Sequence, residues 1–140
     1  MNTKERRHAE IFCDGASSGN PGNAGIGVVI NLHDGSPACR ISEYIGIATN
    51  NVAEYTAFIR ALEEARSLGI KRVKVFLDSE LVVKQINGLY KVKNINLMPL
   101  WIRAKNILAD FDSFTVAHVK RDMNKEADAL ATKAVKQRRA

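Results

Sequence analysis

The chain has 140 residues, of which 46% are hydrophobic and 26% are charged, a size and balance typical of one globular domain. Its 21 Lys and Arg exceed its 15 Asp and Glu, and the net charge of +6 suits a polyanionic partner. No apolar run is long enough to span a membrane, and the charged first ten residues do not resemble a signal peptide. Two cysteines, Cys13 and Cys39, make neither a disulfide framework nor a zinc motif, so we expect a reduced, cytoplasmic protein without a membrane partner.

The first third of the chain predicts three antiparallel strands joined by polar turns. An apolar run ends at Asp14, a small glycine-rich segment follows, and a second apolar run begins. Taken alone, Asp14 and Gly15 are a common hairpin signal and predict a plain turn. Gly25 and Gly27 in the second run indicate either a bulge or the close approach of another element. The expected strands span residues 10–14, 24–32 and 38–48.

The rest of the chain alternates between helical and strand patterns. Alanines and larger apolar groups at helical spacing follow Thr49, Asn50 and Asn51, whose side chains can cap a helix. The expected elements are a helix at 52–68, a strand at 71–78, helices at 79–88 and 99–111, a strand at 114–119 and a helix capped by Asn124 that runs to about residue 135. This order predicts an α/β fold with a mixed sheet covered by helices. We expect one domain, residues 1–140, with frayed ends at 1–9 and 136–140.

Four acidic residues lie at the predicted edges of these elements. Asp14 and Asp78 end strands, whereas Glu54 and Asp128 lie in the first turns of helices. Strand ends and helix starts meet at one edge of an α/β sheet, so the four carboxylates converge if the first and fourth strands are neighbours. Each acid also has a purely structural interpretation, because acids are favoured at helix N-termini and Asp78 with Ser79 can cap a helix.

Four carboxylates at one edge would repel one another strongly unless a cation neutralised them. Oxygen ligands without paired cysteines or a histidine cluster favour Mg²⁺ or Mn²⁺ over zinc. Two such ions ~3.5–4 Å apart can bind the attacking water and the leaving oxygen of a phosphodiester, which is a nuclease mechanism. The pattern therefore predicts a site for two metal ions, formed by Asp14, Glu54, Asp78 and Asp128.

The segments that carry these acids resemble type 1 ribonuclease H, in its compact form without an extra hybrid-binding domain or basic protrusion. The resemblance covers residues 11–134 and rests on four ordered motifs: Asp14-Gly-Ala-Ser-Ser-Gly-Asn-Pro-Gly22, Thr49-Asn-Asn-Val-Ala-Glu54-Tyr55, Leu77-Asp-Ser-Glu-Leu-Val-Val-Lys-Gln-Ile86 and His118-Val-Lys-Arg-Asp-Met-Asn124-Lys-Glu-Ala-Asp128-Ala-Leu-Ala131. It implies a five-stranded mixed sheet with helices on both faces. It also implies hydrolysis of the RNA strand of RNA/DNA hybrids, leaving 5′-phosphate and 3′-hydroxyl ends.

The resemblance implies a role for each acid. Asp14 would bridge both metal ions, and Asp128 would help to hold the ion that activates water. Glu54 and Asp78 would hold the ion that faces the leaving group. Glu54 would also touch a ribose 2′-hydroxyl, the group by which a protein distinguishes RNA from DNA.

Three asparagines, Asn20, Asn50 and Asn51, look like the minor-groove and sugar contacts of that family. Short amides both donate and accept hydrogen bonds, which suits 2′-hydroxyls and base edges in a shallow groove. Each asparagine has the alternative interpretation of a turn or helix-cap residue. For Asn50 and Asn51 the two interpretations have equal weight, since one residue can cap a helix and bind a ligand at once.

The sequence departs from some family members before the last acid, where they place a histidine in a mobile loop. Here His118 stands ten residues before Asp128, close to the end of a predicted strand. We therefore expect a form without the mobile loop, in which a catalytic role for His118 is the lesser alternative. Arg121 or Lys120 is expected to meet the phosphate instead.

The region of the basic protrusion is also reduced. Lys91 and Lys93 stand there, with Arg103 and Lys105 further on, and these side chains either contact the hybrid or are simply solvated. Glu80 occupies a position where some relatives have an uncharged amide, so it either weakens binding or faces solvent.

Two alternatives to hybrid cleavage stay open. An enzyme of the same class would also cleave double-stranded RNA, because recognition is mainly of shape. A non-catalytic module that binds hybrids or RNA is the alternative from another class, and the presence of all four acids argues against it. We expect a stand-alone monomer rather than a nuclease domain from a polymerase or transposase.

Overall fold

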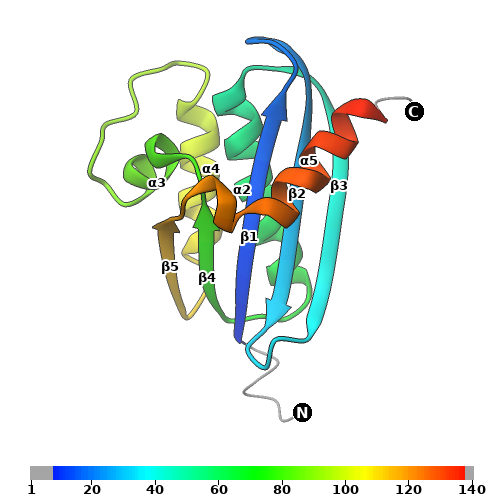
Figure 1. Ribbon diagram of the computed structural model, residues 1–140. Helices are drawn as coiled ribbons and strands as arrows, with labels where there is room; N and C mark the ends of the chain where they lie inside the picture. The colour runs from blue at the N-terminus through cyan, green and yellow to red at the C-terminus, as the bar shows by residue number, and fades with distance from the viewer. Residues whose placement is uncertain (1–7, 138–140) are drawn as a thin grey trace.

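The first three strands form an antiparallel meander, as their alternating apolar residues predict. In the computed structural model, which describes residues 8–137, they are β1 (His8–Ser17), β2 (Gly22–Leu32) and β3 (Pro37–Ala48). Helix α2 (Asn50–Ser67) leads to β4 (Arg72–Leu77), which pairs in parallel with β1, and β5 (Ser113–His118) pairs in parallel with β4. The order β3-β2-β1-β4-β5 confirms the predicted five-stranded mixed sheet (Figure 1).

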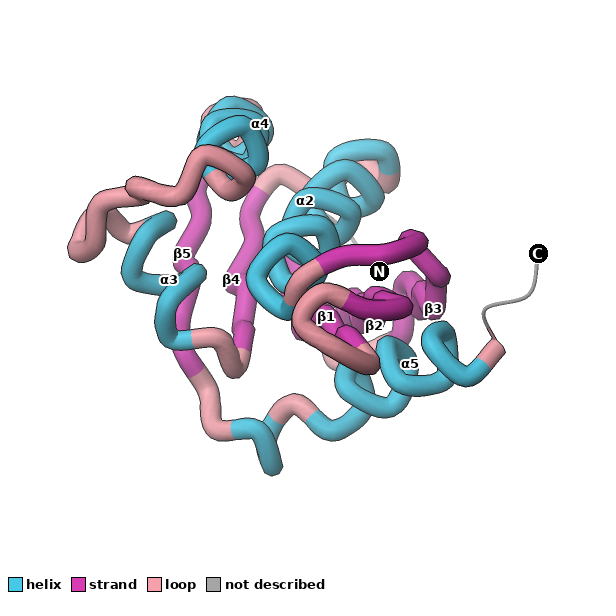
Figure 2. The backbone as a smooth tube through the Cα atoms, turned by 90° about the horizontal axis from the view of Figure 1, so that it is seen from above, coloured by secondary structure: helices cyan, strands magenta, loops and turns pink. Residues whose placement is uncertain are grey.

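Helices cover both faces of this sheet, as expected. Helices α2, α3 (Glu80–Ile86) and α4 (Met98–Leu108) lie on one face, and the short helix η1 (Arg121–Met123) leads into α5 (Lys125–Lys136) on the other (Figure 2). The main core lies between the sheet and α2, where Tyr55, Phe58 and Leu62 are fully buried. Among residues 8–137, no helix has the length and apolar character needed to cross a membrane.

Strand β1 is longer than the sequence predicts, and this changes the position of the first acid. The pairing of β1 with β2 continues to Ser17, whereas its pairing with β4 stops at Phe12 and Phe76. The prediction that Asp14 ends the strand is therefore wrong, and so is the reading of Asp14 and Gly15 as a turn. Asp14 lies inside β1, two residues beyond the point where β4 separates from it.

Helix α5 lies directly on β2 because two glycines leave room for its backbone. A Cβ atom on Gly27 would lie 2.0 Å from the Ala127 carbonyl oxygen, and one on Gly25 would lie 2.7 Å from that of Ala131. Of the two predicted alternatives, the close approach is confirmed. The pairing of β2 with β3 also shifts in register between Ala24 and Gly25, but the additional residue there, Ile45, belongs to β3. This packing places the start of α5 against the middle of the sheet.

The helix starts correct three sequence-based assignments. Thr49 is the cap of α2, and its Oγ1 accepts a hydrogen bond from the Val52 N–H at 3.2 Å. Asn50 and Asn51 are thus helical rather than capping residues, and Glu54 lies in the second turn instead of the first. Asn124 holds the N-cap position of α5, but its side chain makes no capping bond.

The ends of the chain are more ordered than the predicted frayed segments. His8 and Ala9 belong to β1, because they pair with Arg72 and Val73 of β4. Lys136 is the last residue of α5. The remaining predicted frayed residues, apart from 137, lie outside the described part of the chain.

Candidate active site

A cleft of about 520 Å³ opens where β1, β4, α2 and α5 meet. It gathers all four predicted acids together with two of the predicted asparagines and the predicted arginine. The residues that line it are Asp14, Gly15, Ala16, Ser17, Asn50, Asn51, Glu54, Asp78, Ser79, Arg121 and Asp128. Side chains that are more than a hundred residues apart in sequence thus face one solvent-accessible space.

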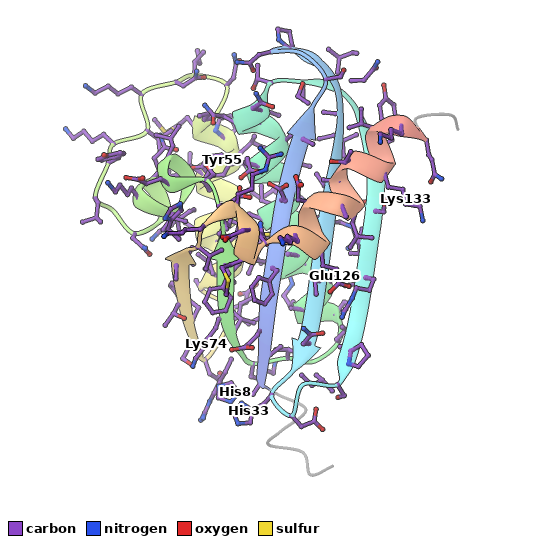
Figure 3. The ribbon with its side chains drawn as sticks, in the orientation of Figure 1. His8, His33, Tyr55, Lys74, Glu126 and Lys133 are labelled. Atoms are coloured by element: carbon purple, nitrogen blue, oxygen red, sulfur yellow. The ribbon has the colours of Figure 1, made fainter. Side chains whose placement is uncertain are left out.

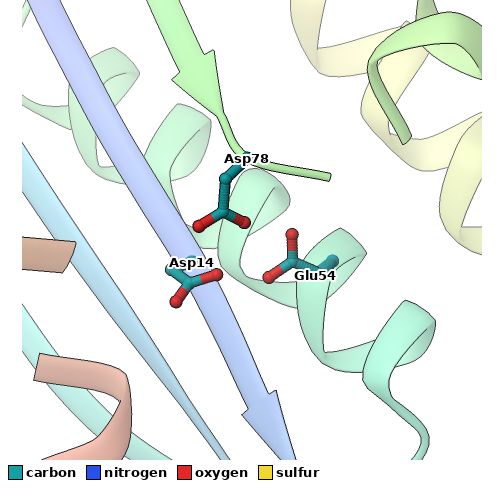
Figure 4. A group of neighbouring side chains, drawn as sticks. All are labelled: Asp14, Glu54 and Asp78. Carbon is teal, nitrogen blue, oxygen red and sulfur yellow. The ribbon is translucent and has the colours of Figure 1, made fainter. Parts of the chain in front are cut away.

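Three of the acids form the centre of the cleft. One carboxylate oxygen from each of Asp14, Glu54 and Asp78 lies within 4.8 Å of the others (Figure 4). The side chains come from β1, α2 and the residue after β4, so the parallel pairing of β1 with β4 creates the cluster. Asp128, in the first turn of α5, lines the same cleft close to Asp14.

Glu54 reaches the cluster because α2 packs unusually close to β1. A Cβ atom on Gly15 would lie 2.2 Å from the Ala53 carbonyl carbon, so only glycine permits this approach. The Gly15 N–H then donates a hydrogen bond of 2.5 Å to Glu54 Oε1. The absence of a side chain at Gly15 therefore allows α2 to pack against β1. The sequence did not reveal this role, because Asp-Gly is also a common turn signal.

Burial makes the charged forms of these carboxyls unfavourable without a cation. Asp14 is 5% exposed and Glu54 is 6% exposed. Burial, followed by the neighbouring Glu54, raises the pKa of Asp14 well above its usual range. Burial also raises the pKa of Glu54, although the neighbouring Asp14 and the hydrogen bond from the Gly15 N–H oppose that shift.

The residues present fit a hard divalent cation. All candidate ligands are carboxylate oxygens, the donor type that Mg²⁺ and Mn²⁺ prefer. Glu54 Oε2 is buried and has no hydrogen-bond partner among residues 8–137. Such an orphaned acceptor is costly unless something binds it, and a cation in this cleft would do so.

Among residues 8–137, Arg121 is the cationic side chain that lines the cleft. Its Nη2 lies 3.5 Å from Asp128 Oδ1, and its side chain is 79% exposed. At this length and exposure the ion pair is weak. Arg121 is thus free to turn toward an anion in the cleft.

The predicted asparagines border the acids. Asn50 and Asn51 lie in the first turn of α2, are exposed, and line the cleft. Asn20 does not line it, but its Oδ1 accepts a hydrogen bond from the Asn50 N–H at 3.1 Å. The loop between β1 and β2 is therefore tied to the rim of the cleft.

Several other predicted contacts lie outside the cleft. His118 is the exposed last residue of β5, and Lys91 and Lys93 are exposed in the loop between α3 and α4, away from the sheet (Figure 1). Arg103 forms an ion pair with Glu63, and Lys105 donates to the Ile86 carbonyl. These two side chains have structural partners of their own.

Glu80 and the other histidines also have local partners. Glu80 is exposed and pairs with Lys84 at 2.6 Å, one turn along α3. His8 and His33 stack on each other, with ring centroids 5.0 Å apart, at the end of the sheet where β1 begins (Figure 3). The histidines therefore do not join the acids.

Comparison with known proteins identifies the family. A family model described as reverse transcriptase-like matches residues 12–134. Ribonuclease HI of Halobacterium salinarum is 42% identical over 130 residues, which make up 93% of this chain. The structure of ribonuclease H1 from the same organism has a TM-score of 0.91 and 40% identity, covering 93% of this chain and 98% of that one. The chain belongs to the type 1 ribonuclease H family.

A second similar structure in this family contains nucleic acid. LC11 ribonuclease H1, solved in complex with an RNA/DNA hybrid, has a TM-score of 0.87 and 40% identity. The match covers 92% of this chain and 97% of that one. The similarity in fold thus extends over nearly the whole length of both chains.

Two of the relatives that share 42% identity with this chain are considerably longer than it. The match covers 64% of the Halobacterium protein and 35% of a bifunctional protein of Mycobacterium tuberculosis, which is 42% identical over 126 residues. Similarity therefore concerns the ribonuclease H part of these relatives.

Proposed function

We propose that this protein is an endoribonuclease that hydrolyses the RNA strand of RNA/DNA hybrids. The observation that carries the proposal is a group of three carboxylates in an open cleft, the buried Asp14 and Glu54 and the half-buried Asp78, with Asp128 beside them. Membership of the ribonuclease H family and the hybrid bound to a relative with 40% identity support the substrate.

The four carboxylates would hold two Mg²⁺ or Mn²⁺ ions. Asp14 would contribute to both ions, which is supported by the closeness of its carboxyl to those of Glu54, Asp128 and Asp78. Bound divalent cations would neutralise the scissile phosphate and lower the pKa of the attacking water. The orphaned Oε2 of Glu54 supports occupation of the site by a cation.

The rim of the cleft would distinguish and orient the RNA strand. The exposed side-chain amides of Asn50 and Asn51 can donate to and accept from 2′-hydroxyls and base edges. Asn20 positions the start of this helix through its hydrogen bond to the Asn50 N–H. Arg121 would contact a phosphate, since its present partner Asp128 holds it only weakly.

Contacts beyond the cleft remain predictions from the sequence. Lys91 and Lys93 are exposed and available to a long duplex, and His118 lies at the end of β5 without lining the cleft. Within residues 8–137 both cysteines are free, which agrees with the reducing cytoplasm that we propose as the location. A monomeric state is part of the same proposal.

A panel of four end-labelled substrates tests this function. The purified protein would be incubated with RNA/DNA hybrid, duplex RNA, single-stranded RNA and duplex DNA, each with Mg²⁺, Mn²⁺ or chelator. We expect metal-dependent cleavage of the hybrid RNA, with 5′-phosphate ends on the products. Cleavage of duplex RNA at a similar rate would favour the broader activity, and binding without cleavage in either metal would show a non-catalytic module.

A further inference from the structure

Asn124 is a buried polar residue directly behind the acid cluster. It is 1% exposed and does not line the cleft. Its Nδ2 donates to the Cys13 carbonyl at 3.0 Å and lies 3.5 Å from Asp78 Oδ2. One amide thus touches the residue before Asp14 and the carboxylate of Asp78.

This amide lies where β1 and β4 separate. The parallel pairing of the strands ends at Phe12 and Phe76, and Asp14 and Asp78 each follow two residues later. Ladder hydrogen bonds therefore no longer set the spacing between the two strands at the acids. The Asn124 side chain bridges that gap, since it contacts both segments.

The orientation of the amide follows from its neighbours. The Cys13 carbonyl can only accept a hydrogen bond, and the same is true of an ionised Asp78 carboxylate. Nδ2 must therefore face them, which leaves Oδ1 buried and without a partner among residues 8–137. An apolar side chain would avoid this orphaned oxygen, but it would leave the Cys13 carbonyl and Asp78 without a donor.

Asn124 also connects to a third acid through its main chain. Its carbonyl oxygen accepts the Asp128 N–H at 3.0 Å, in the first turn of α5. Three of the four acids are therefore held by segments that meet at this residue. The fourth acid, Glu54, is held separately by the Gly15 N–H.

We propose that Asn124 is a positioning residue that sets the spacing of Asp14, Asp78 and Asp128 for metal binding. This inference rests on the proposed metal-dependent function. Removing the amide would let β1 and β4 move relative to each other at the acids and would remove the donor that orients Asp78. Partners that orient ligands in this way typically change metal affinity by about 10- to 100-fold when they are lost.

Calorimetric titration with Mn²⁺, without nucleic acid, tests the proposal directly. The variants are Asn124→Ala and Asn124→Ser, and the matched control is Asn87→Ala. Asn87 lies at the end of α3, and its Nδ2 makes a similar hydrogen bond, 2.9 Å to the Val116 carbonyl, away from the acids. Serine is well tolerated at a helix N-cap and retains a shorter donor, so it provides a second folded variant.

We expect Asn124→Ala to bind Mn²⁺ about tenfold more weakly than the wild type, with Asn124→Ser between them. Asn87→Ala should bind Mn²⁺ like the wild type, even if it melts at a lower temperature. At saturating Mn²⁺ the KM for hybrid should be unchanged in the Asn124 variants, because the substrate-binding rim is intact.

The outcomes separate this inference from the proposed function. Absence of Mn²⁺ binding by the wild type would overturn the proposed function. Wild-type binding together with equal affinity in folded Asn124 variants would overturn the positioning role alone. Failure of both Asn124 variants to fold would also contradict it, since Asn124 would then be required for folding rather than for positioning.

Discussion

The residues before and after Asp14 are both fixed by hydrogen bonds to other elements. The Cys13 carbonyl before it accepts from Asn124, and the Gly15 N–H after it donates to Glu54. The carboxyl itself is buried beside Glu54, and both effects raise the pKa of Asp14. A residue so fixed is ready to bind a cation, but in the metal-free protein it lowers stability at every pH at which the unfolded chain would be ionised there.

The metal-free protein should lose stability as the pH rises. The folded state binds protons at Asp14 and Glu54 more tightly than the unfolded chain does, because burial raises both pKa values. Their contribution to stability is therefore complete below about pH 4 and is lost as the pH passes through the raised pKa values. At pH 8 with chelator, Asp14→Asn should be more stable than the wild type by roughly 1–3 kcal/mol.

Urea denaturation of both proteins at pH 5 and pH 8 measures this effect. The stability difference should shrink toward pH 5, because the proton that the wild type takes up on folding is bound at lower cost as the pH falls. Added Mg²⁺ should stabilise the wild type and not the variant, because only a site with Asp14 binds the ion well. Equal stability of the two proteins at pH 8 would be inconsistent with a raised pKa at Asp14.

Arg121→Ala should impair hybrid cleavage without affecting the fold. Its side chain is mostly exposed and its ion pair with Asp128 is long, so the stability change should stay within about 0.5 kcal/mol. Loss of one phosphate contact should make the slope of log affinity against log salt concentration shallower by about 0.9. Steady-state kinetics at two salt concentrations provide the measurement, and Lys133→Ala, an exposed change of equal charge on α5, is the control. Unchanged turnover and KM in Arg121→Ala would exclude the phosphate contact.

At the scale of elements, three close approaches build the cleft. Gly15 admits α2 to β1, and Gly25 and Gly27 admit α5 to β2. Arg40 on β3 pairs with Glu126, and Ser42 donates to the Leu130 carbonyl, so α5 is also fixed from the edge of the sheet. The distance between Asp14 and Asp128 thus depends on backbone packing rather than on flexible side chains.

Gly27→Ala should reduce activity more than its loss of stability explains. The added methyl group would overlap the Ala127 carbonyl, so α5 and its Asp128 must shift, at a cost of about 1–3 kcal/mol. Gly35→Ala is the control, because its positive φ of 88° makes alanine strained although no atom lies within 4 Å. The test compares hybrid cleavage at a temperature where both variants are folded. Equal activity of the two variants would show that the position of α5 is unimportant.

The sequence patterns predicted most of the elements and a mixed sheet covered by helices, because periodicity and element order determine these features. The five strands and the helices on both faces were implied by the family resemblance, and the meeting of the four acids depended on β1 and β4 being neighbours, which the pairing now shows. They misplaced the end of β1, since only the partner β2 extends that strand past Asp14. They also missed Asn124, which looked like a cap, because its contact with Cys13 spans 111 residues. Contacts of that range leave no local signal.

At the scale of the whole molecule, the net charge of the chain is opposite in sign to the charge of the four carboxylates in the cleft. The chain carries a net charge of +6, yet the cleft concentrates four carboxylates. Among residues 8–137, exposed lysines such as Lys91 and Lys93 lie outside the cleft, where they can attract a polyanion toward it.

Binding of the hybrid should consequently weaken as salt is added. Two phosphate contacts alone would reduce affinity about tenfold between 50 and 200 mM salt. The measurement is a titration of labelled hybrid with Asp14→Asn, which avoids cleavage, at several salt concentrations. An affinity that does not change with salt would argue against a basic surface that contacts phosphates.

The most direct test of the central claim is the rate of hybrid cleavage by Asp14→Asn beside the wild type in saturating Mg²⁺ or Mn²⁺. Circular dichroism and hybrid binding would first establish that the variant is folded and still engages the substrate. The proposed role of Asp14 at the centre of the metal site predicts a loss of at least about a thousandfold in rate. A folded, hybrid-binding variant that cleaves at close to the wild-type rate would show that the carboxylate cluster is not the catalytic centre.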